Sequence, residues 1–324
     1  MTVSVGIIGA GHLGTRHALN LLELDEARVV AVADTDVARA ADLARRCDAQ
    51  AHVDYRALLD DPSLDAVYLC VPAHEHGGPE LAVLERSLAL FVERPLDVDL
   101  SIADRIAAEV DARGVVTATG CRWRYLDTVE RAAEVLADNP ARMVIGGWAA
   151  RTHETAWWED QRRMGGQLIE QTNQLVDLCR LLVGEIAQAW AVGRPTTCPP
   201  EPDAADTSAV SLRFAGGAAG SFAATPAPSP NPRPGLRVVA EGLALDLRST
   251  QLLVDHGGRC EVHDAQADAV LRADRDFVRA VGGEENRVRA PYTETLRSHR
   301  VAVAVAEATR TGGAADLRWH AHAH

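Results

Sequence analysis

Three glycines near the start of the chain are spaced for binding a phosphate-bearing ligand. Gly9, Gly11 and Gly14 follow the apolar stretch 3–8 and precede a helical pattern. In this setting the first glycine permits a tight turn, the second lets a pyrophosphate approach the backbone, and the third lets helix and strand pack closely. The free N–H groups at the start of the helix favour an anion. The dinucleotide contacts predicted here are Gly9, Gly11, His12, Leu13 and Gly14.

A carboxylate at the end of the second apolar stretch supports this prediction. Asp34 follows residues 28–33 and lies about twenty residues after Gly14, the usual spacing for a ribose-binding acid. It can accept hydrogen bonds from both hydroxyls of an adenosine ribose, and it would repel a 2′-phosphate. We therefore predict NAD rather than NADP. The alternative is an ordinary strand–helix–strand unit with a glycine-rich turn.

A second group of polar residues lies in a helical pattern predicted over 167–183. Glu170, Gln174 and Asp177 are spaced i, i+4 and i+7, which places them on one face of a regular helix. Gly165 and Gly166 precede the helix and permit a close backbone approach. The face is a candidate ligand surface, and a face turned to solvent is the alternative.

These residues are carried by two kinds of element pattern. In the first part of the chain, strands alternate with helices, which predicts a parallel, doubly wound sheet whose ligands bind at the carboxyl ends of the strands. The strands are expected at residues 3–8, 29–33, 65–71, 88–93 and 115–119. After about residue 122, consecutive strand patterns predict a largely antiparallel sheet, with helices near 128–136, 268–281 and 294–310. The fold class is thus an α/β dinucleotide-binding domain over 1–122 and an α+β domain over 123–324, whose last helix could pack back on the first domain.

The composition limits the class of partner. With 324 residues, 47% of them hydrophobic, the chain is long enough for two cores, and its net charge of −13 disfavours nucleic acid and anionic membranes. We expect no membrane span, no metal site and, since no signal-peptide pattern is visible, a cytoplasmic protein. Six scattered cysteines form no Cys-x-x-Cys pair, which predicts reduced thiols. The chain contains no lysine.

Six short motifs follow one another along the chain: Gly9-Ala-Gly-His-Leu-Gly14, Val32-Ala-Asp34, Val71-Pro-Ala-His-Glu-His76, Glu93-Arg-Pro95, Gly120-x-x-x-Arg124-Tyr125 and the stretch 165–177. Together and in this order, they resemble the motifs of the Gfo/Idh/MocA oxidoreductase family. The resemblance covers essentially the whole chain. It implies a nicotinamide cofactor, hydride transfer to or from a carbinol carbon, and substrates that are mostly sugars, cyclitols and their derivatives.

The resemblance also assigns roles to individual residues. It places Pro72, His74, Glu93 and Arg94 beside the cofactor and Arg124 beside the substrate. Two positions depart from the family pattern. Arg94 stands where the family usually has a lysine near the reacting hydroxyl, and Gln174 stands where it commonly has the acid/base histidine. The lysine-free composition makes the first replacement weaker evidence for loss of activity.

The two replacements change which group could carry a proton. Arg94 is a poor base but can stabilise an alkoxide or bind a carboxylate or phosphate, and Gln174 can hydrogen-bond a substrate oxygen. We therefore assign catalysis to Arg94, Glu170 and Gln174, with Glu170 as the first candidate proton carrier if burial raises its pKa. His153 is the second candidate, and Tyr125 and Asp177 remain open.

The rest of the substrate site is assigned to the loop after residue 150 and to the helix. The substrate contacts expected are Arg124, His153, Trp158 and Asp177. Trp157 and Trp158 could stack on a sugar ring or could serve packing. The predicted activity is NAD-dependent oxidoreduction of a sugar-like polyol by a homodimer or homotetramer. An NAD-binding protein without turnover, and a lyase or hydrolase using bound NAD for transient oxidation, are the alternatives.

Overall fold

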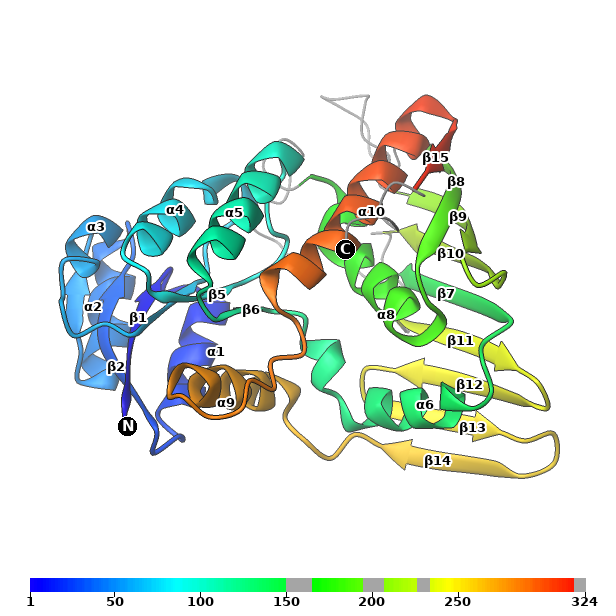
Figure 1. Cartoon of the computed structure of the whole chain (residues 1–324), viewed down its shortest axis with the longest axis horizontal. Helices are drawn as coiled ribbons and strands as arrows, with labels where there is room; N and C mark the ends of the chain where they lie inside the picture. The colour runs from blue at the N-terminus through cyan, green and yellow to red at the C-terminus, as the bar shows by residue number, and fades with distance from the viewer. Residues whose placement is uncertain (150–164, 195–206, 226–233, 318–324) are drawn as a thin grey trace. The chain divides into compact units, whose positions relative to one another are not determined.

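The computed structural model describes residues 1–149, 165–194, 207–225 and 234–317. The chain divides into two compact units (Figure 1). The first unit contains residues 1–125 and 268–296, and the second contains residues 126–267 and 297–324. No helix in the described ranges has the length and apolar character needed to cross a bilayer. His153 and Trp158 lie outside the described residues.

The first unit is built on a six-stranded sheet in which every pairing is parallel. The strand order is β3-β2-β1-β4-β5-β6, the order of a doubly wound dinucleotide-binding fold. Its strands are β1 (Val3–Ile8), β2 (Ala27–Ala33), β3 (Gln50–His52), β4 (Ala66–Leu69), β5 (Ala89–Val92) and β6 (Thr117–Thr119). The predicted parallel sheet is confirmed.

Helices join these strands, and polar caps set where they begin. The helices are α1 (His12–Leu21), α2 (Val37–Cys47), α3 (Tyr55–Leu58), α4 (Gly78–Glu85), α5 (Leu100–Arg113) and α9 (Ala269–Val281), with 3₁₀ turns η1 (Ala73–Glu75) and η2 (Arg122–Tyr125). The side chains of Asp36, Asp99 and Asp268 each accept a backbone N–H in the first turn of a helix. Gly114 ends α5 in the left-handed conformation with φ 63°, which glycine adopts without strain.

Side chains alternate across this sheet and bury against helices on both faces. Leu90 and Val92 of β5 belong to the apolar cluster that contains residues of α4 and α5. Phe91, between them, turns to the opposite face, where it stacks on Tyr68 and meets Phe277 of α9 edge-on. Helix α9 packs beside α1, although it follows α1 by some 250 residues (Figure 1). The first sheet is therefore covered on this face partly by a segment from the end of the chain.

The second unit is a nine-stranded, mostly antiparallel sheet in the order β14-β13-β12-β11-β7-β10-β9-β8-β15. Its strands are β7 (Met143–Ala149), β8 (Ile186–Arg194), β9 (Thr207–Phe214), β10 (Ala219–Thr225), β11 (Gly235–Ala240), β12 (Leu243–Arg248), β13 (Gln251–Asp255), β14 (Cys260–Asp264) and β15 (Ala314–Asp316). Only the β7–β10 pair is parallel among the described pairings. The predicted antiparallel architecture is confirmed.

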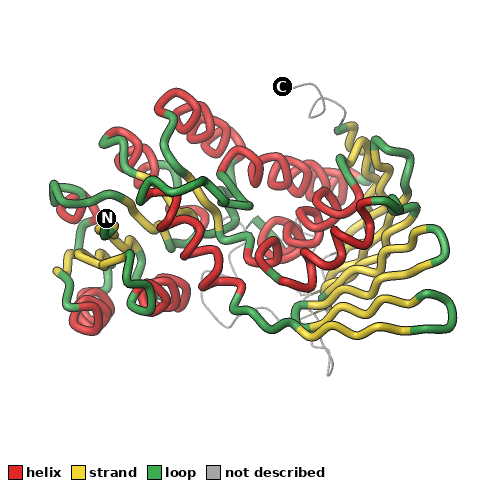
Figure 2. Tube along the Cα trace, turned by 60° about the horizontal axis from the view of Figure 1, so that its bottom comes forward, coloured by secondary structure: helices red, strands yellow, loops and turns green. Residues whose placement is uncertain are grey.

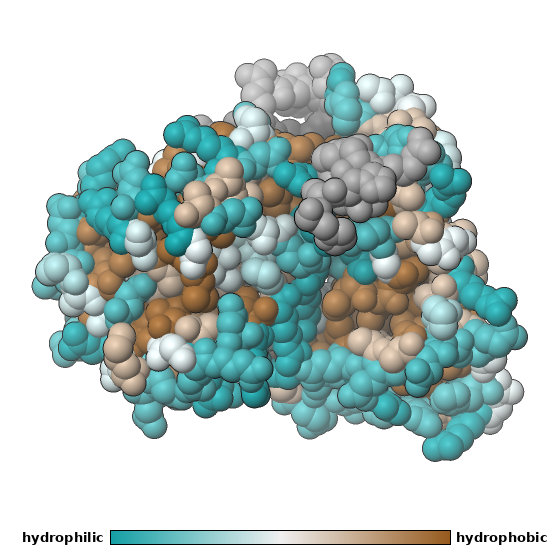
Figure 3. Space-filling view, in the orientation of Figure 1, coloured by the Kyte–Doolittle hydropathy of each residue, from teal (hydrophilic) through white to brown (hydrophobic). Residues whose placement is uncertain are grey.

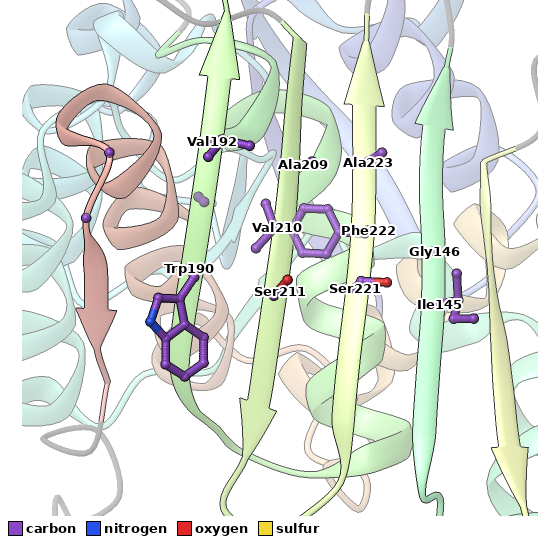
Figure 4. Close-up of a pocket in the computed structure, with 13 residues that line it drawn as sticks. Ile145, Gly146, Trp190, Val192, Ala209, Val210, Ser211, Ser221, Phe222 and Ala223 are labelled. Carbon is purple, nitrogen blue, oxygen red and sulfur yellow. The ribbon is translucent and has the colours of Figure 1, made fainter.

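The described helices of the second unit gather on one face of its sheet (Figure 2). They are α6 (Asp127–Ala137), α8 (Asn173–Val183) and the part of α10 (Tyr292–Thr311) that belongs to this unit. The opposite face is exposed, and residues paired across the strands form rows on it. One row runs Trp190, Ser211, Ser221 and Ile145 across β8, β9, β10 and β7 (Figure 4). Small side chains at the centre of this face leave a shallow depression of about 540 Å³.

Away from the exposed sheet face, each unit has regions of mainly polar surface. Hydrophilic residues predominate over α2 and α3 in the first unit and along the β13–β14 hairpin in the second (Figure 3). This distribution agrees with the burial pattern of β14, where no residue is buried.

The helix predicted over 167–183 begins differently from the prediction. Residues Leu168–Thr172 (η4) form a π-helical turn, and regular α-helix begins only at Asn173. A π turn holds one extra residue, so the i, i+4, i+7 spacing of a regular helix does not apply to Glu170. Such turns concentrate at functional sites because they change the direction in which side chains point.

Candidate dinucleotide and substrate site

The glycine turn has the geometry that a bound pyrophosphate needs. Gly9 has φ 97°, and a Cβ there would lie 2.4 Å from the Cys70 carbonyl oxygen. A Cβ at Gly14 would lie 1.8 Å from the Gly9 carbonyl oxygen, so these two positions require glycine for packing. A Cβ at Gly11 meets no described atom within 4 Å. The second glycine therefore leaves an open space, as expected where a ligand approaches the backbone.

The start of α1 faces this space. Gly11 is the N-cap of α1 and provides no side-chain hydrogen bond to the helix. The two residues that follow, His12 and Leu13, are exposed. The N–H groups of the first turn and the helix dipole are thus available to an anion.

Asp34 lies directly beside the glycine turn. Its Oδ2 accepts a hydrogen bond from the Ala10 N–H at 2.8 Å, and its Oδ1 accepts one from the Asp36 N–H at 2.8 Å. Each carboxylate oxygen has a second lone pair for a ribose hydroxyl. The carboxylate also attracts the nearby Arg39, whose Nε donates to Asp36 at 2.9 Å and whose pKa is raised chiefly by that bond.

The two histidines after β4 have different surroundings. His76 is buried, with Nδ1 2.8 Å from Glu80 Oε1 and Nε2 3.2 Å from the Val71 carbonyl oxygen. Burial would lower its pKa, but the charge and hydrogen bond of Glu80, the hydrogen bond of Val71 and the charge of Asp97 together outweigh burial, so the pKa is raised. His74, just after Pro72, is half-buried, and its Nδ1 has no hydrogen-bond partner among the residues the structure describes. His74 is therefore the one of the two with a ring nitrogen left for a ligand.

Glu93, at the end of β5, is held by the protein on both carboxylate oxygens. Oε1 lies 2.9 Å from His17 Nε2, and Oε2 accepts the Arg94 N–H at 3.2 Å. Burial would raise the pKa of Glu93, but the hydrogen bond and charge of His17 bring it below its usual value. The other ring nitrogen of His17, Nδ1, lies 2.6 Å from Asp274 Oδ1. Sequence reasoning missed His17 and Asp274; the available signal was a carboxylate on the apolar face of the α9 pattern.

Arg94 and Arg122 follow neighbouring strands, β5 and β6, at the same edge of the sheet. Arg122 is exposed to solvent as a residue. The protein atoms around its guanidinium group still remove part of its hydration, which lowers its pKa, and the charge of Arg94 lowers the pKa further. The charge of the Glu93 carboxylate acts in the opposite direction and raises the pKa of Arg122, so two guanidinium groups and one carboxylate follow the strands at this edge. Arg122 was not among the predicted site residues.

Arg124, one of the predicted substrate contacts, is buried and hydrogen-bonded within the first unit. It is 7% exposed, and its Nη1 donates to the Arg289 carbonyl oxygen at 2.9 Å. Its Nη2 donates to Glu294 Oε1 at 3.3 Å. All three residues belong to the first unit, where Arg124 ties residues 289–294 to the end of the parallel sheet.

In the second unit, the polar residues of η4 and α8 are largely buried. Glu170, in the π turn, is half-buried, whereas Gln174 and Asp177 are each 4% exposed. A face turned to solvent is therefore excluded. Gln174 Oε1 is buried and accepts no hydrogen bond from the described part of the chain. An unpaired buried carbonyl is costly, by about 1–3 kcal/mol, unless a ligand donates to it.

Asp177 contributes to a network that joins α8 to α10. Its Oδ1 accepts a hydrogen bond from Ser298 Oγ at 2.6 Å, and Ser298 Oγ accepts one from Arg180 Nη1 at 2.6 Å. Arg180 also pairs with Glu185, with 2.8 Å between Nη2 and Oε1. The network fixes α8 in the second unit, and Asp177 has this structural role whatever else it binds.

The fold and these sites define a protein with a dinucleotide-binding parallel sheet and a second, mostly antiparallel sheet domain. Two family models match the chain: "Oxidoreductase family, NAD-binding Rossmann fold" over residues 3–121, and "GFO/IDH/MocA C-terminal domain" over residues 140–242. The chain belongs to the Gfo/Idh/MocA oxidoreductase family, as the sequence motifs predicted.

Individual relatives are distant. The chain is 27% identical to myo-inositol 2-dehydrogenase of Thermotoga maritima over 221 residues, which is 67% of this chain and 66% of that protein. It is 33% identical to D-xylose 1-dehydrogenase (NADP(+)) 2 of Haloferax volcanii over 202 residues, 59% of this chain and 60% of that one. The matches to these curated relatives thus span about two thirds of their length or less. A solved structure of levoglucosan dehydrogenase with NADH superposes with a TM-score of 0.86 at 19% identity, covering 98% of this chain and 99% of the other.

The open space at Gly11 gives a specific prediction. Gly11 has φ −72°, which alanine adopts without strain, so Gly11→Ala should leave the melting temperature nearly unchanged. The added methyl group occupies the space for the pyrophosphate, so the Kd for NADH should rise about tenfold or more, as measured by calorimetry. Gly14→Ala is the contrasting variant, because its Cβ collides with Gly9 and should destabilise the fold itself. Unchanged NADH affinity in Gly11→Ala would contradict the assignment of the site.

Proposed function

We propose that this protein is an NAD-dependent oxidoreductase that moves a hydride between nicotinamide and the carbinol or carbonyl carbon of a sugar, cyclitol or related polyol. The observation that carries the proposal is the open cradle at Gly11 with Asp34 beside it. The first unit supplies the cofactor contacts, which we assign to Gly9, Gly11, His12, Leu13, Gly14, Asp34, Pro72, His74, Glu93 and Arg94. The family and the printed activities of its members, which include inositol and xylose dehydrogenases, support the substrate class.

When bound, the nicotinamide ring supplies the hydride chemistry, and this chain must position the substrate and move a proton. Glu170 is the proton carrier in our proposal, since Gln174 cannot titrate and Arg94 holds its proton. Gln174 Oε1 accepts a hydrogen bond from a substrate hydroxyl, which satisfies the buried carbonyl. Arg94 stabilises the oxygen on the reacting carbon as charge develops there.

The positive charge of Arg94 and Arg122 favours substrates that carry an acid group. A guanidinium binds a carboxylate or phosphate through paired hydrogen bonds, and a second cation nearby strengthens the attraction. Sugar acids and phosphorylated polyols therefore belong in any substrate panel, beside neutral polyols. His153 and Trp158 remain proposed substrate contacts from the sequence.

We predict a specific result for the proton carrier. Glu170→Gln removes the titratable group but keeps the shape, so kcat should fall about 100-fold or more, the size of a lost general acid or base. The Kd for NADH should change less than about threefold, because Glu170 is not a proposed cofactor contact. Turnover is measured by NADH absorbance with the panel of polyols, keto-sugars and sugar acids. The control is Glu307→Gln, an exposed carboxylate on α10 that pairs with Arg310.

The same panel separates the competing functions. Release or consumption of NADH by the wild-type protein supports net redox turnover. Product formation without added cofactor and without net NADH would indicate a lyase or hydrolase that oxidises its substrate transiently. NAD binding with no turnover across the panel would indicate a binding protein, the function that Gln174 favours. Near-full activity in Glu170→Gln would move the proton to another group, with His153 next.

The cofactor preference depends on Asp34. A 2′-phosphate placed at the ribose would meet this carboxylate, so we propose NAD over NADP. Asp34→Ser should raise kcat/KM for NADP by about tenfold or more, since each 1.4 kcal/mol of relieved repulsion corresponds to tenfold. The nearby Arg39 could then pair with the phosphate. Asp36→Ser is the matched control, because it keeps a helix-capping side chain and leaves Asp34 in place. Equal or tighter binding of NADP by the wild-type protein would refute the preference.

The exposed face of the second sheet supports a proposed homodimer or homotetramer. The row next to the one through Trp190 runs Val192, Ala209 and Ala223, so small residues lie at the centre with larger apolar groups at the side. Trp190 is 45% exposed and Val192 67% exposed, which is unusual for groups of their size on a flat sheet face. A second copy of the chain, laid on this face, would cover them.

We also propose that the enzyme acts in the cytoplasm, where NAD is available.

A charge at the centre of this face tests the assembly. Ala209→Glu places a carboxylate among apolar groups, so we expect it to lower the molar mass measured by light scattering from that of an oligomer toward 34.7 kDa. Val262→Glu, on β14 of the same sheet and 55% exposed, should leave the mass unchanged. A wild-type protein that is monomeric at micromolar concentration would refute the interface.

A further inference from the structure

A buried histidine links helix α9 to the end of strand β5. His17 is 1% exposed, and its two ring nitrogens lie 2.6 Å from Asp274 Oδ1 and 2.9 Å from Glu93 Oε1. Neither carboxylate can donate when ionised, whereas a neutral imidazole has only one N–H. Both bonds are made at once only if His17 carries two protons.

The surroundings leave the imidazole ring no other position. Its centroid lies 5.2 Å from that of Tyr68 and 4.8 Å from that of Phe91, and Phe277 packs edge-on against both of these rings. Asn20 Nδ2 donates to the second oxygen of Asp274 at 2.7 Å. Asp274 is thereby fixed from two residues of α1, and it fixes the ring of His17 in turn.

The hydrogen bonds from Asp274 through His17 end at the Glu93 carboxylate, which follows the carboxyl end of β5. Cofactors of parallel sheets bind at these strand ends. Oε1 is bound by His17, and Oε2 accepts the Arg94 N–H. On the other side, a Cβ at Gly120 would lie 2.1 Å from Oε2, so the end of β6 is pressed against the carboxylate. The orientation of Glu93 therefore sets the position of the Arg94 backbone.

We propose that His17 is a positioning residue that, by donating to both Asp274 and Glu93, fixes the Glu93 carboxylate and so orients Arg94 toward the reacting oxygen. The role of Arg94 in this inference rests on the proposed function. The role of His17 in holding Glu93 rests only on the contacts within the first unit.

The charges around His17 keep it protonated over a wide pH range. Burial would lower its pKa, but Asp274 from α9 and Glu93 from β5 raise it to about 10. Tyr68 and Cys70 of the β4 region also lie nearby, and burial raises the pKa of each well above its usual value, so both stay neutral. The stabilisation that His17 gives is complete below its ordinary pKa of 6.5 and is lost as the pH rises through about 10.

The first test is His17→Gln, whose amide N–H₂ reaches one carboxylate while its oxygen faces the other. We expect kcat to fall about 10- to 100-fold, the effect of misplacing a reacting group by about 1 Å. The Kd for NADH should rise by a smaller factor, about threefold, because Glu93 and Arg94 are only two of the proposed cofactor contacts. The difference in unfolding free energy between wild type and variant, from urea melts, should shrink as the pH rises from 6.5 to 10.

A matched control separates positioning from simple loss of stability. Phe277→Leu loosens the packing of α9 against Tyr68 and Phe91 without touching the polar contacts. It should lower the melting temperature while leaving kcat within about threefold. Asp274→Asn, which keeps an acceptor but removes a charge, should shift the loss of activity at high pH to a lower pH than in the wild type, and it also serves if His17→Gln does not fold.

The backbone amide of Arg94 gives a readout that does not need turnover. In ¹H–¹⁵N spectra of the full chain, His17→Gln should move the Arg94 amide signal strongly and Phe277→Leu should not. If the wild type turns over no substrate, the proposed function fails, and this signal alone still decides the role of His17. An unmoved Arg94 signal, or equal losses of kcat in His17→Gln and Phe277→Leu, would overturn the proposal.

Discussion

The first unit depends on the close approach of α1 to the strands that Gly9 and Gly14 permit. Because a Cβ at Gly14 would lie 1.8 Å from the Gly9 carbonyl oxygen, no other residue lets the helix begin there. His17 follows Gly14 by three residues, on the same buried face of α1. The contact that brings the helix N-terminus to the phosphate position therefore also brings an imidazole down onto the sheet. Cofactor binding and the fixing of Glu93 follow from one steric constraint.

This arrangement explains why a distant part of the chain belongs to the first unit. The amphipathic helix α9 buries Ala273, Phe277 and Val278 and carries Asp274 on the same face. An unpaired carboxylate there would cost several kcal/mol, and the protonated His17 removes that cost. The apolar contacts hold α9 against α1, while the charge pair requires one register. Buried ion pairs add little net stability over an apolar pair of the same shape, so their value here is geometric.

Local signals in the sequence were sufficient for the parallel sheet, the glycine turn and Asp34, because each depends on neighbours within one strand–helix–strand unit. The short strands β3, β14 and β15 were not predicted, since they owe their conformation to pairing partners rather than to apolar alternation; β14, for example, has no buried residue. The π turn at Glu170 was not predicted either, because the residue pattern over 167–183 fits a regular helix equally well. Amphipathicity predicted α9 but could not identify the surface it covers, and so His17 and Asp274 were missed.

Gln174 illustrates how the structure changes the interpretation of a residue. On the sequence alone, glutamine in place of a histidine that commonly acts as the acid/base suggests lost chemistry. In the structure its Oε1 is buried on a helix that Asp177, Ser298 and Arg180 hold firmly in place. A protein gains nothing in stability from an unpaired buried carbonyl, which costs about 1–3 kcal/mol. The same atom becomes favourable when the hydroxyl of a ligand donates a hydrogen bond to it. Gln174 is therefore better suited to orienting a polyol than to moving its proton, which leaves the proton to a neighbour that can titrate.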